Sequence, residues 1–298
     1  MPELRIAFLG DVVGAPGRRA VAHAWPKLRD LHGAHALIVN GENSRNGSGC
    51  SPDNFRELRR SGADAVTLGD HAFKDRMILE TLEDPLQPIA RPANLSAGAP
   101  GKRIVRIELP EKAGGAQTGG TPAQPPVYVL TVLGRLFMPL MANSPFECVD
   151  REMQLLASGE DANAMVIIEI HAEATSEKQA MAWHCLEKWS GRESKNGGAG
   201  GAGPRVVAVV GTHTHVQTAD ARVLEHSVAA ITDLGMCGPH RSVIGRDVNA
   251  TLSTMARQAP ASLDVASGDN RACGVIIRID TEHRRAIGIE IVNLSVPE

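Results

Sequence analysis

The chain has 298 residues, of which 43% are hydrophobic, and this suits one large domain or two ordinary ones. Charged residues make up 22% and the formal net charge is -3, so bulk electrostatics do not indicate a polyanionic partner. Aromatic residues are only 3%, which argues against a stacking platform for single-stranded nucleic acid.

The cysteines and the N-terminal residues indicate a compartment. Five cysteines are scattered without a Cys-x-x-Cys pair, so no disulfide framework is expected and a reducing cytosol fits best. The apolar run in MPELRIAFLGD is too short for a secretory signal or a membrane span. We therefore expect a cytoplasmic protein without a membrane partner.

Apolar runs of strand length alternate with helix-like stretches, which predicts alternating β and α elements. Strands are expected in RIAFLGD, ALIVNGEN, AVTLGDH, MVIIEIH, VVAVVGTHTH, SVAAIT, GVIIRID and IGIEIV. Helices are expected near 16–31, 52–62, 75–83, 146–158 and 175–190. Pro26 predicts a break or kink in the first helix, and Ser176 with Gln179 resembles a capping box at the start of the last.

Two stretches, near 111–126 and 191–203, are rich in glycine and polar residues. They cannot bury enough apolar area to offset the entropy of ordering, so we expect flexible insertions. Residues of metal-binding type lie on both sides of each insertion. The sequence therefore predicts one α/β domain over residues 1–298 that contains both insertions.

Side chains of metal-binding type follow five expected strands. Ligands bind at the carboxyl ends of strands in open α/β sheets, because loops converge there. Each residue alone has an ordinary explanation as a cap or a hydrogen-bonded core residue, but their joint occurrence favours one site. The eight side chains are Asp11, Glu42, Asn43, Asp70, His71, His171, His213 and His215.

The stretch VVAVVGTHTHVQ ends a buried strand with two histidines one residue apart. Side chains at i and i+2 of an extended backbone project from the same face, so we expect His213 and His215 to converge from a continued strand. For this pair alone, hydrogen bonding at the strand end is an equal alternative. Asp220 and Asp233 either support this loop or cap turns, and Glu173 either orients an imidazole or begins a surface helix.

The number and type of these side chains favour two metal ions. One zinc takes three or four ligands, whereas two ions that share a bridging carboxylate and a bridging hydroxide would use the whole set. Imidazole with carboxylate favours iron or manganese, divalent or mixed-valence, and is compatible with zinc. Two ions about 3.5 to 4 Å apart are typical of phosphoester hydrolysis, and a mononuclear esterase is the simpler alternative.

The order of GDVVG, NGEN, LGDH, IHAEATSEK and GTHTHVQTAD resembles the calcineurin-like metallophosphoesterases, and more closely their YmdB-like branch. The similarity extends from about residue 5 to residue 292 and includes RPAN at 91–94 and ITDLGMCGP at 231–239. Many members of this branch hydrolyse phosphodiesters such as 2′,3′-cyclic nucleotides. The resemblance implies a β-sandwich flanked by helices, in four layers, with a dinuclear metal site at one end.

The resemblance also implies a role for each residue. Glu42 would bridge the two ions, and His71 would stay off the metals near the phosphate. A metal-bridging hydroxide would attack phosphorus while His71 protonates the leaving alkoxide, or a neutral His71 would only hydrogen-bond the phosphate. The first ion would take Asp11 and His215, and the second would take Asn43, Asp70, His171 and His213.

The third motif departs from the family pattern. The family reads Gly-Asn-His where this chain has Gly69-Asp70-His71. Asn keeps an NH₂ group that can donate to a substrate oxygen, whereas Asp adds a charge and loses that donor. We therefore expect firmer metal retention, weaker attraction for phosphodiesters and reduced turnover.

Asp70 motivates an alternative function, a metal-containing regulatory or RNA-associated binding protein with low turnover. His71 favours the enzyme, because a purely binding site has little use for it. The expected substrate is a small phosphodiester or cyclic nucleotide, and the sequence is compatible with an RNA-related partner and with a homo-oligomer.

Overall fold

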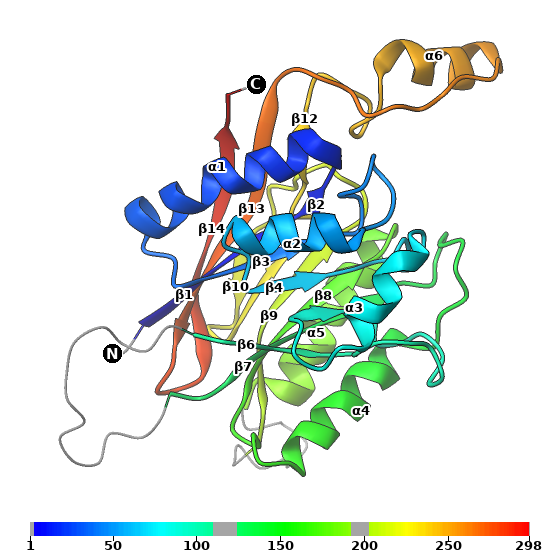
Figure 1. Cartoon of the computed structure of the whole chain (residues 1–298). Helices are drawn as coiled ribbons and strands as arrows, with labels where there is room; N and C mark the ends of the chain where they lie inside the picture. Colours follow the sequence, from blue (N-terminus) through cyan, green and yellow to red (C-terminus); the bar gives the residue numbers. More distant parts are fainter. Residues whose placement is uncertain (1–2, 110–123, 192–202, 298) are drawn as a thin grey trace.

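The computed structural model describes residues 3–109, 124–191 and 203–297. The predicted insertions at 111–126 and 191–203 therefore lie almost wholly outside the described residues. In the part that is described, two β-sheets pack face to face and helices cover their outer surfaces (Figure 1). This arrangement confirms the predicted α/β sandwich flanked by helices.

The first sheet contains eight strands within the described ranges, and its parallel strands place several predicted site residues at one edge. The parallel strands are β1 (Glu3–Leu9), β3 (Ala36–Asn40), β4 (Ala65–Thr67) and β5 (Ile89–Ala90). The long hairpin of β13 (Asn270–Asp280) and β14 (Arg285–Ser295) lies antiparallel beside β1, and β12 (Met236–Pro239) and β2 (Asp11–Val12) extend the edge beyond β13.

The second sheet contains six strands in the described part of the chain. Its four central strands are parallel, so their carboxyl ends also share one edge: β7 (Val127–Leu133), β8 (Met165–His171), β9 (Arg205–Thr212) and β11 (Val228–Ile231). The antiparallel strands at the two borders are β6 (Val105–Ile107) and β10 (Arg222–Leu224).

Helices shield the outer face of each sheet. The first sheet is covered by α1 (Gly14–His32), α2 (Pro52–Arg60), the 3₁₀ turn η1 (Arg76–Ile78) and α3 (Leu79–Glu83). The second sheet is covered by α4 (Pro145–Ala157) and α5 (Thr175–Trp189). In contrast, α6 (Val248–Arg257) stands away from both sheets (Figure 1). None of the described helices is long and apolar enough to cross a bilayer.

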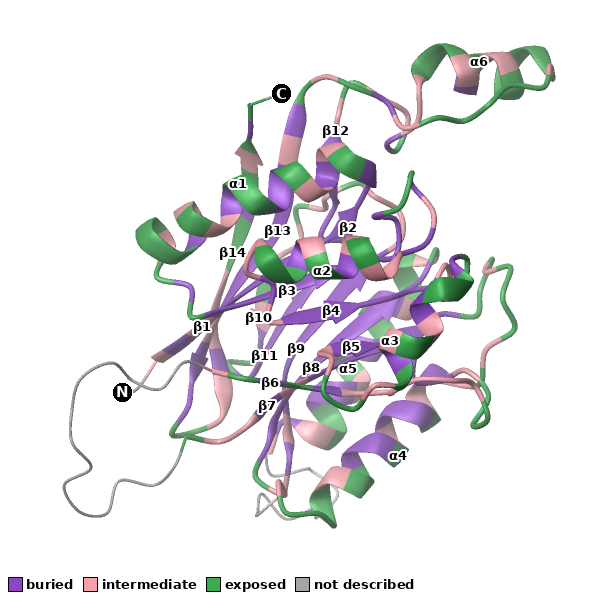
Figure 2. Ribbon diagram, in the orientation of Figure 1, coloured by how far each residue is buried: buried purple, intermediate pink, exposed green. Residues whose placement is uncertain are grey.

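Burial follows the layers. A core of aliphatic side chains fills the space between the sheets, where Phe8 of the first sheet and Ile167 of the second are fully buried. Separate apolar layers join each sheet to its helices. In Figure 2 most strands are buried in the interior, and the helices that cover them expose their outer faces. Because both faces of each sheet are covered, polar side chains on the strands are expected mainly at their ends.

Two local predictions about helices are wrong, the break at Pro26 and the capping box at Ser176. The first helix continues through Pro26 as one element. Pro26 and Ala22 are both exposed, so water can bind the Ala22 carbonyl that loses its helical partner. The last predicted helix, α5, begins after Ala174 without a side-chain cap. Its Glu177 instead accepts hydrogen bonds from the backbone N–H groups of Arg135 and Leu136.

Candidate metal centre

The predicted site residues meet where the carboxyl ends of the two sheets converge. Asp11 begins β2, Glu42 and Asn43 follow β3, and Asp70 and His71 follow β4. His171 is the last residue of β8, and the two remaining histidines follow β9. The contacts below connect all eight side chains into one cluster, although they span more than two hundred positions of sequence.

Three side chains form one group of donors around His171. The imidazole Nε2 of His171 lies 3.0 Å from Asp70 Oδ1 and 3.1 Å from His213 Nδ1. His213 Nδ1 lies 3.6 Å from the same Asp70 oxygen. Three ligand-type atoms that face a common point at this spacing are suitable for one metal ion.

A second group lies around Asp11, which is fully buried. Among the described residues Asp11 Oδ1 has no hydrogen-bond partner, and the nearest cationic candidate there is His215 Nε2 at 3.7 Å. The amide of Asn43 lies on this side, with Nδ2 3.2 Å from His215 Nε2. A buried carboxylate oxygen without a donor is costly, and a cation would satisfy it.

Glu42 lies between the two groups and is 1% exposed. Its Oε1 is 3.3 Å from His171 Nε2 and 3.2 Å from Asn43 Nδ2. Its Oε2 accepts a hydrogen bond from the backbone N–H of His71 at 3.1 Å. Gly69 leaves room beside it, because a Cβ there would lie 2.2 Å from Glu42 Oε2 and 2.4 Å from His171 Nε2.

Each of the three histidines in these groups uses its second ring nitrogen outside the centre. His171 Nδ1 lies 2.9 Å from the Thr212 hydroxyl, and His215 Nδ1 lies 3.0 Å from the carbonyl oxygen of Ile244. His213 Nε2 lies 3.3 Å from a carboxylate oxygen of Glu173. Such outer partners orient metal-binding imidazoles and select the nitrogen that faces the ion.

The backbone of the His-x-His segment is not extended, which corrects the prediction of a continued strand. β9 ends at Thr212, and φ is +99° at His213 and +65° at His215. Positive φ is strained for residues other than glycine and persists only where surrounding contacts impose it. The bent backbone directs the two imidazoles into different donor groups rather than onto one point.

Asp233 supplies contacts that hold this bend. Its Oδ2 accepts hydrogen bonds from the backbone N–H and the hydroxyl of Thr214, at 3.2 and 2.7 Å. The same oxygen lies 2.8 Å from Lys178 Nζ in an ion pair that is almost fully buried. Asp233 therefore supports the His-x-His loop, one of the two roles that the sequence left open.

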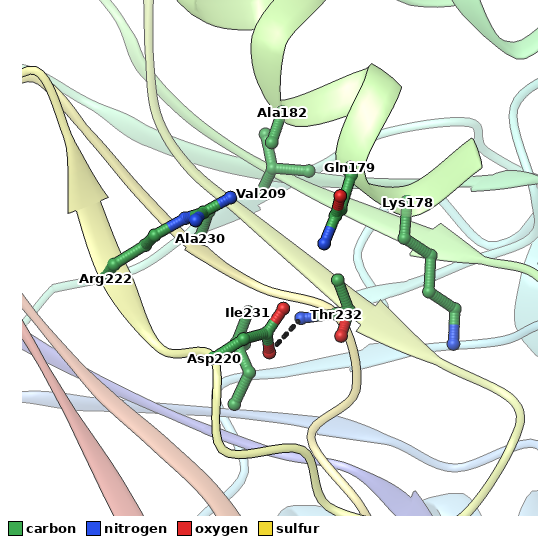
Figure 3. A pocket seen from close by; sticks show the side chains of 9 residues that line it. All are labelled: Lys178, Gln179, Ala182, Val209, Asp220, Arg222, Ala230, Ile231 and Thr232. Carbon is green, nitrogen blue, oxygen red and sulfur yellow. Dashed lines mark hydrogen bonds between the residues drawn. The ribbon is translucent and has the colours of Figure 1, made fainter. Parts of the chain in front are cut away.

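A small pocket lies behind this loop, between α5 and the strands β9 and β11 (Figure 3). Lys178 and Gln179 line it from α5, and Asp220 accepts a hydrogen bond from the backbone N–H of Thr232 at 3.1 Å. Its volume of about 10 Å³ has room for about one water molecule. The pocket is therefore too small for a substrate.

Charges at the centre compensate one another. Burial raises the pKa of the Asp11 carboxyl, although His215 and His171 oppose the rise. Burial also acts on Asp70, but hydrogen bonds with His171 and His213 hold its pKa well below the usual range. Burial disfavours a charged His171, yet Glu42 and Asp70 hold its pKa well above the usual value. Positive charge is therefore favoured between these carboxylates, and the donor set fits divalent ions.

Comparison with known proteins identifies the family. The model of the YmdB-like protein family matches residues 7–192 and 199–292. This chain belongs to the YmdB-like family. It is 37% identical over 292 residues to the 2′,3′-cyclic-nucleotide 2′-phosphodiesterase of Bacillus subtilis, covering 98% of this chain and 97% of that protein. The resemblance inferred from the sequence motifs is thereby confirmed.

Solved structures agree with this family. The crystal structure of a phosphatase from Mycoplasma pneumoniae has a TM-score of 0.81 at 25% identity, covering 99% of this chain and 94% of that one. The calcineurin-like phosphoesterase YfkN of Bacillus subtilis has a TM-score of 0.54 at 13% identity, covering 98% of this chain and 90% of that one. The second likeness concerns the fold alone, which is that of calcineurin-like phosphoesterases.

Glu169 and Lys178 support the site of this YmdB-like protein, although neither is predicted from the sequence. Glu169 is fully buried on β8, and a lone acid in the apolar run MVIIEIH is the signal that could have found it. Lys178 is 3% exposed. It ends the motif IHAEATSEK, and that is the signal that could have found it, although a helix of mixed composition gives no measure of burial at one position.

Proposed function

We propose that this chain is a metal-dependent phosphodiesterase that hydrolyses small phosphodiesters of the cyclic-nucleotide class. The position of Glu42 between two groups of ligand-type side chains carries the proposal, because a shared carboxylate is what two adjacent ions need. Membership of a family that includes a cyclic-nucleotide phosphodiesterase supports the substrate class.

The ligands are divided between two subsites in this proposal, with Glu42 as the bridge. The contact of Asn43 with His215 favours placing Asn43 in the first subsite, whereas the family resemblance alone placed it in the second. When bound, two iron or manganese ions, or zinc, would supply an activated water and neutralise charge on the phosphoryl oxygens. In this proposal the first subsite is Asp11, Asn43 and His215, from the contacts of His215 with the other two, and the second is Asp70, His171 and His213.

Asn43 links the metal subsites to His71. Its Oδ1 lies 2.7 Å from His71 Nδ1, while its Nδ2 faces Glu42 and His215. To bind an ion, the amide would turn about its axis so that Oδ1 faces the centre and Nδ2 donates to His71 Nδ1. A neutral His71 would then accept at Nδ1 and carry its hydrogen on Nε2, which suits only the hydrogen-bonding role. The acid role needs a protonated ring whose Nδ1–H is directed at Asn43 Oδ1 or at Glu42 Oε1, 3.6 Å away.

His71 is suited to move a proton at the edge of the centre. Its side chain is 29% exposed, and Nε2 lies 3.8 Å from Asp70 Oδ2. A hydrogen on Nε2 can therefore reach a leaving oxygen of a substrate that enters from solvent. In this proposal a protonated His71 is the general acid: it gives the Nε2 proton to the leaving alkoxide and becomes neutral. The alternative is a neutral His71 that only donates a hydrogen bond to the phosphate.

The inter-sheet core supports a single domain. It joins Phe8, Ile167 and Val275, which come from distant parts of the chain, into one layer. We accordingly propose that residues 1–298 form one unit. The five unpaired cysteines support the cytoplasm as its proposed location.

The proposed function is tested on the full chain by counting metal ions and measuring hydrolysis of bis(p-nitrophenyl) phosphate. We expect two ions per chain, loss of hydrolysis with a chelator, and recovery with Mn²⁺. Two ions without hydrolysis would favour the regulatory or RNA-associated binding protein instead. One ion per chain in an active protein would favour a mononuclear esterase.

The role of His71 is tested by His71→Ala with two diesters. Loss of a general acid is expected to lower kcat at least about 100-fold on a diester with a poor alkoxide leaving group, and far less on a nitrophenyl diester. His23→Ala, at an exposed position of α1, is the matched control. An equal loss on both substrates would leave only the hydrogen-bonding role.

A further inference from the structure

A buried polar network lies between the two sheets, directly beneath the metal centre. At its middle is Glu169 of β8, two residues before His171 and fully buried. A buried carboxylate is costly unless hydrogen bonds satisfy it. Its oxygens accept hydrogen bonds from the Asn40 amide at 2.6 Å and from the hydroxyls of Thr131 and Thr212, both at 2.7 Å.

A backbone N–H group fixes the direction of these bonds. The N–H of Glu42 can only donate, and it donates to Asn40 Oδ1 at 3.1 Å. The nitrogen of the Asn40 amide must therefore face Glu169, where it donates to Oε1. Oε1 of Glu169 is consequently an acceptor, and this holds even for a carboxyl protonated on Oε2.

The hydroxyl of Thr212 determines which ring nitrogen of His171 carries the hydrogen. Thr212 has one hydroxyl hydrogen, which it donates to Glu169 Oε1. Its oxygen is then left to accept from the ring N–H of His171, whose Nδ1 lies 2.9 Å away. The hydrogen of His171 is thus held on Nδ1, and Nε2 faces Asp70 and Glu42.

We propose that Glu169 is a positioning residue that acts through Thr212 to present Nε2 of His171 to a metal ion. The inference rests on the proposed metal centre. The other branch of the network, through Asn40, holds the backbone of Glu42. One buried carboxylate therefore positions both the bridging ligand and the imidazole beside it, as outer partners of metal ligands do elsewhere.

A pair of matched valine variants tests the inference. Thr212→Val and Thr131→Val each remove one buried hydroxyl bonded to Glu169, but only Thr212 contacts His171. Zinc affinity is measured on the metal-depleted full chain by competition with a chelating dye. For Thr212→Val we expect about 10- to 100-fold weaker binding of one ion, the usual effect of losing such a partner. Thr131→Val and Thr212→Ser are expected to stay within about twofold of the original chain, since both keep a hydroxyl beside His171.

A second readout observes the imidazole itself. In zinc-loaded protein labelled with ¹⁵N-histidine, we expect a slowly exchanging hydrogen on His171 Nδ1 and a metal-bound Nε2. The same hydrogen should exchange faster in Thr212→Val and stay slow in Thr131→Val. A merely structural role would lower Tm in both valine variants without separating their zinc affinities.

Two results would overturn the inference: equal zinc affinities of the two valine variants, or a His171 Nδ1 without hydrogen in the loaded protein. Its failure is distinguishable from failure of the proposed function. A chain that binds zinc as expected but hydrolyses no diester would contradict the phosphodiesterase and leave the role of Glu169 intact. A chain that binds no zinc would contradict both.

Discussion

At the scale of single residues, Asp70 is the position where this chain differs most informatively from its family. Its Oδ1 lies beside both His171 and His213, so the carboxylate takes the place that a neutral amide oxygen would have in the family motif. Its negative charge lies close to that of Glu42, which in turn lies close to Asp11. The substitution therefore changes the charge at the centre while keeping a ligand oxygen in place.

Replacing Asp70 by Asn is expected to raise kcat/KM for bis(p-nitrophenyl) phosphate and to speed metal release into a chelator. One unit charge at about 4 Å is worth about 1 kcal/mol even in bulk water, which corresponds to at least about fivefold in rate. Asp70→Ala is the control, because it removes the ligand oxygen together with the charge. Unchanged kcat/KM in Asp70→Asn would show that the charge does not limit turnover.

At the scale of elements, the segment between β9 and β10 decides how the two histidines are used. The sequence pattern indicated the right residues but the wrong backbone conformation. The spacing of two histidines at i and i+2 predicts an extended strand only where tertiary contacts do not impose another conformation. Here Thr214 bonds twice to Asp233, and Lys178 neutralises that carboxylate from α5. Strain at His213 and His215, on the order of 1 to 3 kcal/mol each, is thus supported by contacts outside the segment.

Thr214→Val tests this support. The variant loses the hydroxyl bond to Asp233, so the bend should relax and Mn²⁺ affinity should fall by roughly tenfold, the equivalent of about one hydrogen bond to a charged group. Thr214→Ser keeps the hydroxyl and is expected to bind Mn²⁺ as the original chain does. Isothermal titration of the metal-depleted proteins measures both. Wild-type affinity in Thr214→Val would mean that the backbone bond alone holds the bend.

At the scale of the whole molecule, the metal centre joins the two sheets at one edge. Asp11, Glu42 and Asp70 lie in or just after strands of the first sheet, whereas His171 and His213 lie in or just after strands of the second. Ions held by both would stabilise the sandwich, because a ligand that binds only the folded state adds to its stability.

Removal of metal is therefore expected to lower Tm. Each ion present at about 100 times its Kd contributes about 2.7 kcal/mol, and the loss of two ions should lower Tm by roughly 9 °C in a chain of this size. Differential scanning calorimetry with and without EDTA measures the shift. The double variant Asp11→Asn with Glu42→Gln is the control and should not respond to EDTA. An equal response of both proteins would assign the effect to EDTA itself.

Much of the fold could be predicted from the sequence, because apolar runs and turn signals are local. The helices α1, α2, α4 and α5 lie within two residues of their predicted limits. β7 was missed although VYVLTVL is a strand-like run, since it directly follows the glycine-rich stretch. α6 was also missed, and it packs on neither sheet.

The sequence by itself determined which side chains stand at the strand ends and, through its motifs, the family. Residue types at element ends are local properties of the chain, and so is a motif. Only the tertiary structure decided that Glu42 lies between His171 and Asn43, and that the two histidines after β9 approach different partners. His213 lies beside His171 and Asp70, whereas His215 lies beside Asp11 and Asn43. It also decided that Glu169 and Lys178 lie beneath them. These features depend on contacts between segments far apart in sequence. The burial of a charged side chain can be known only when the arrangement of the sheets and helices around it is known.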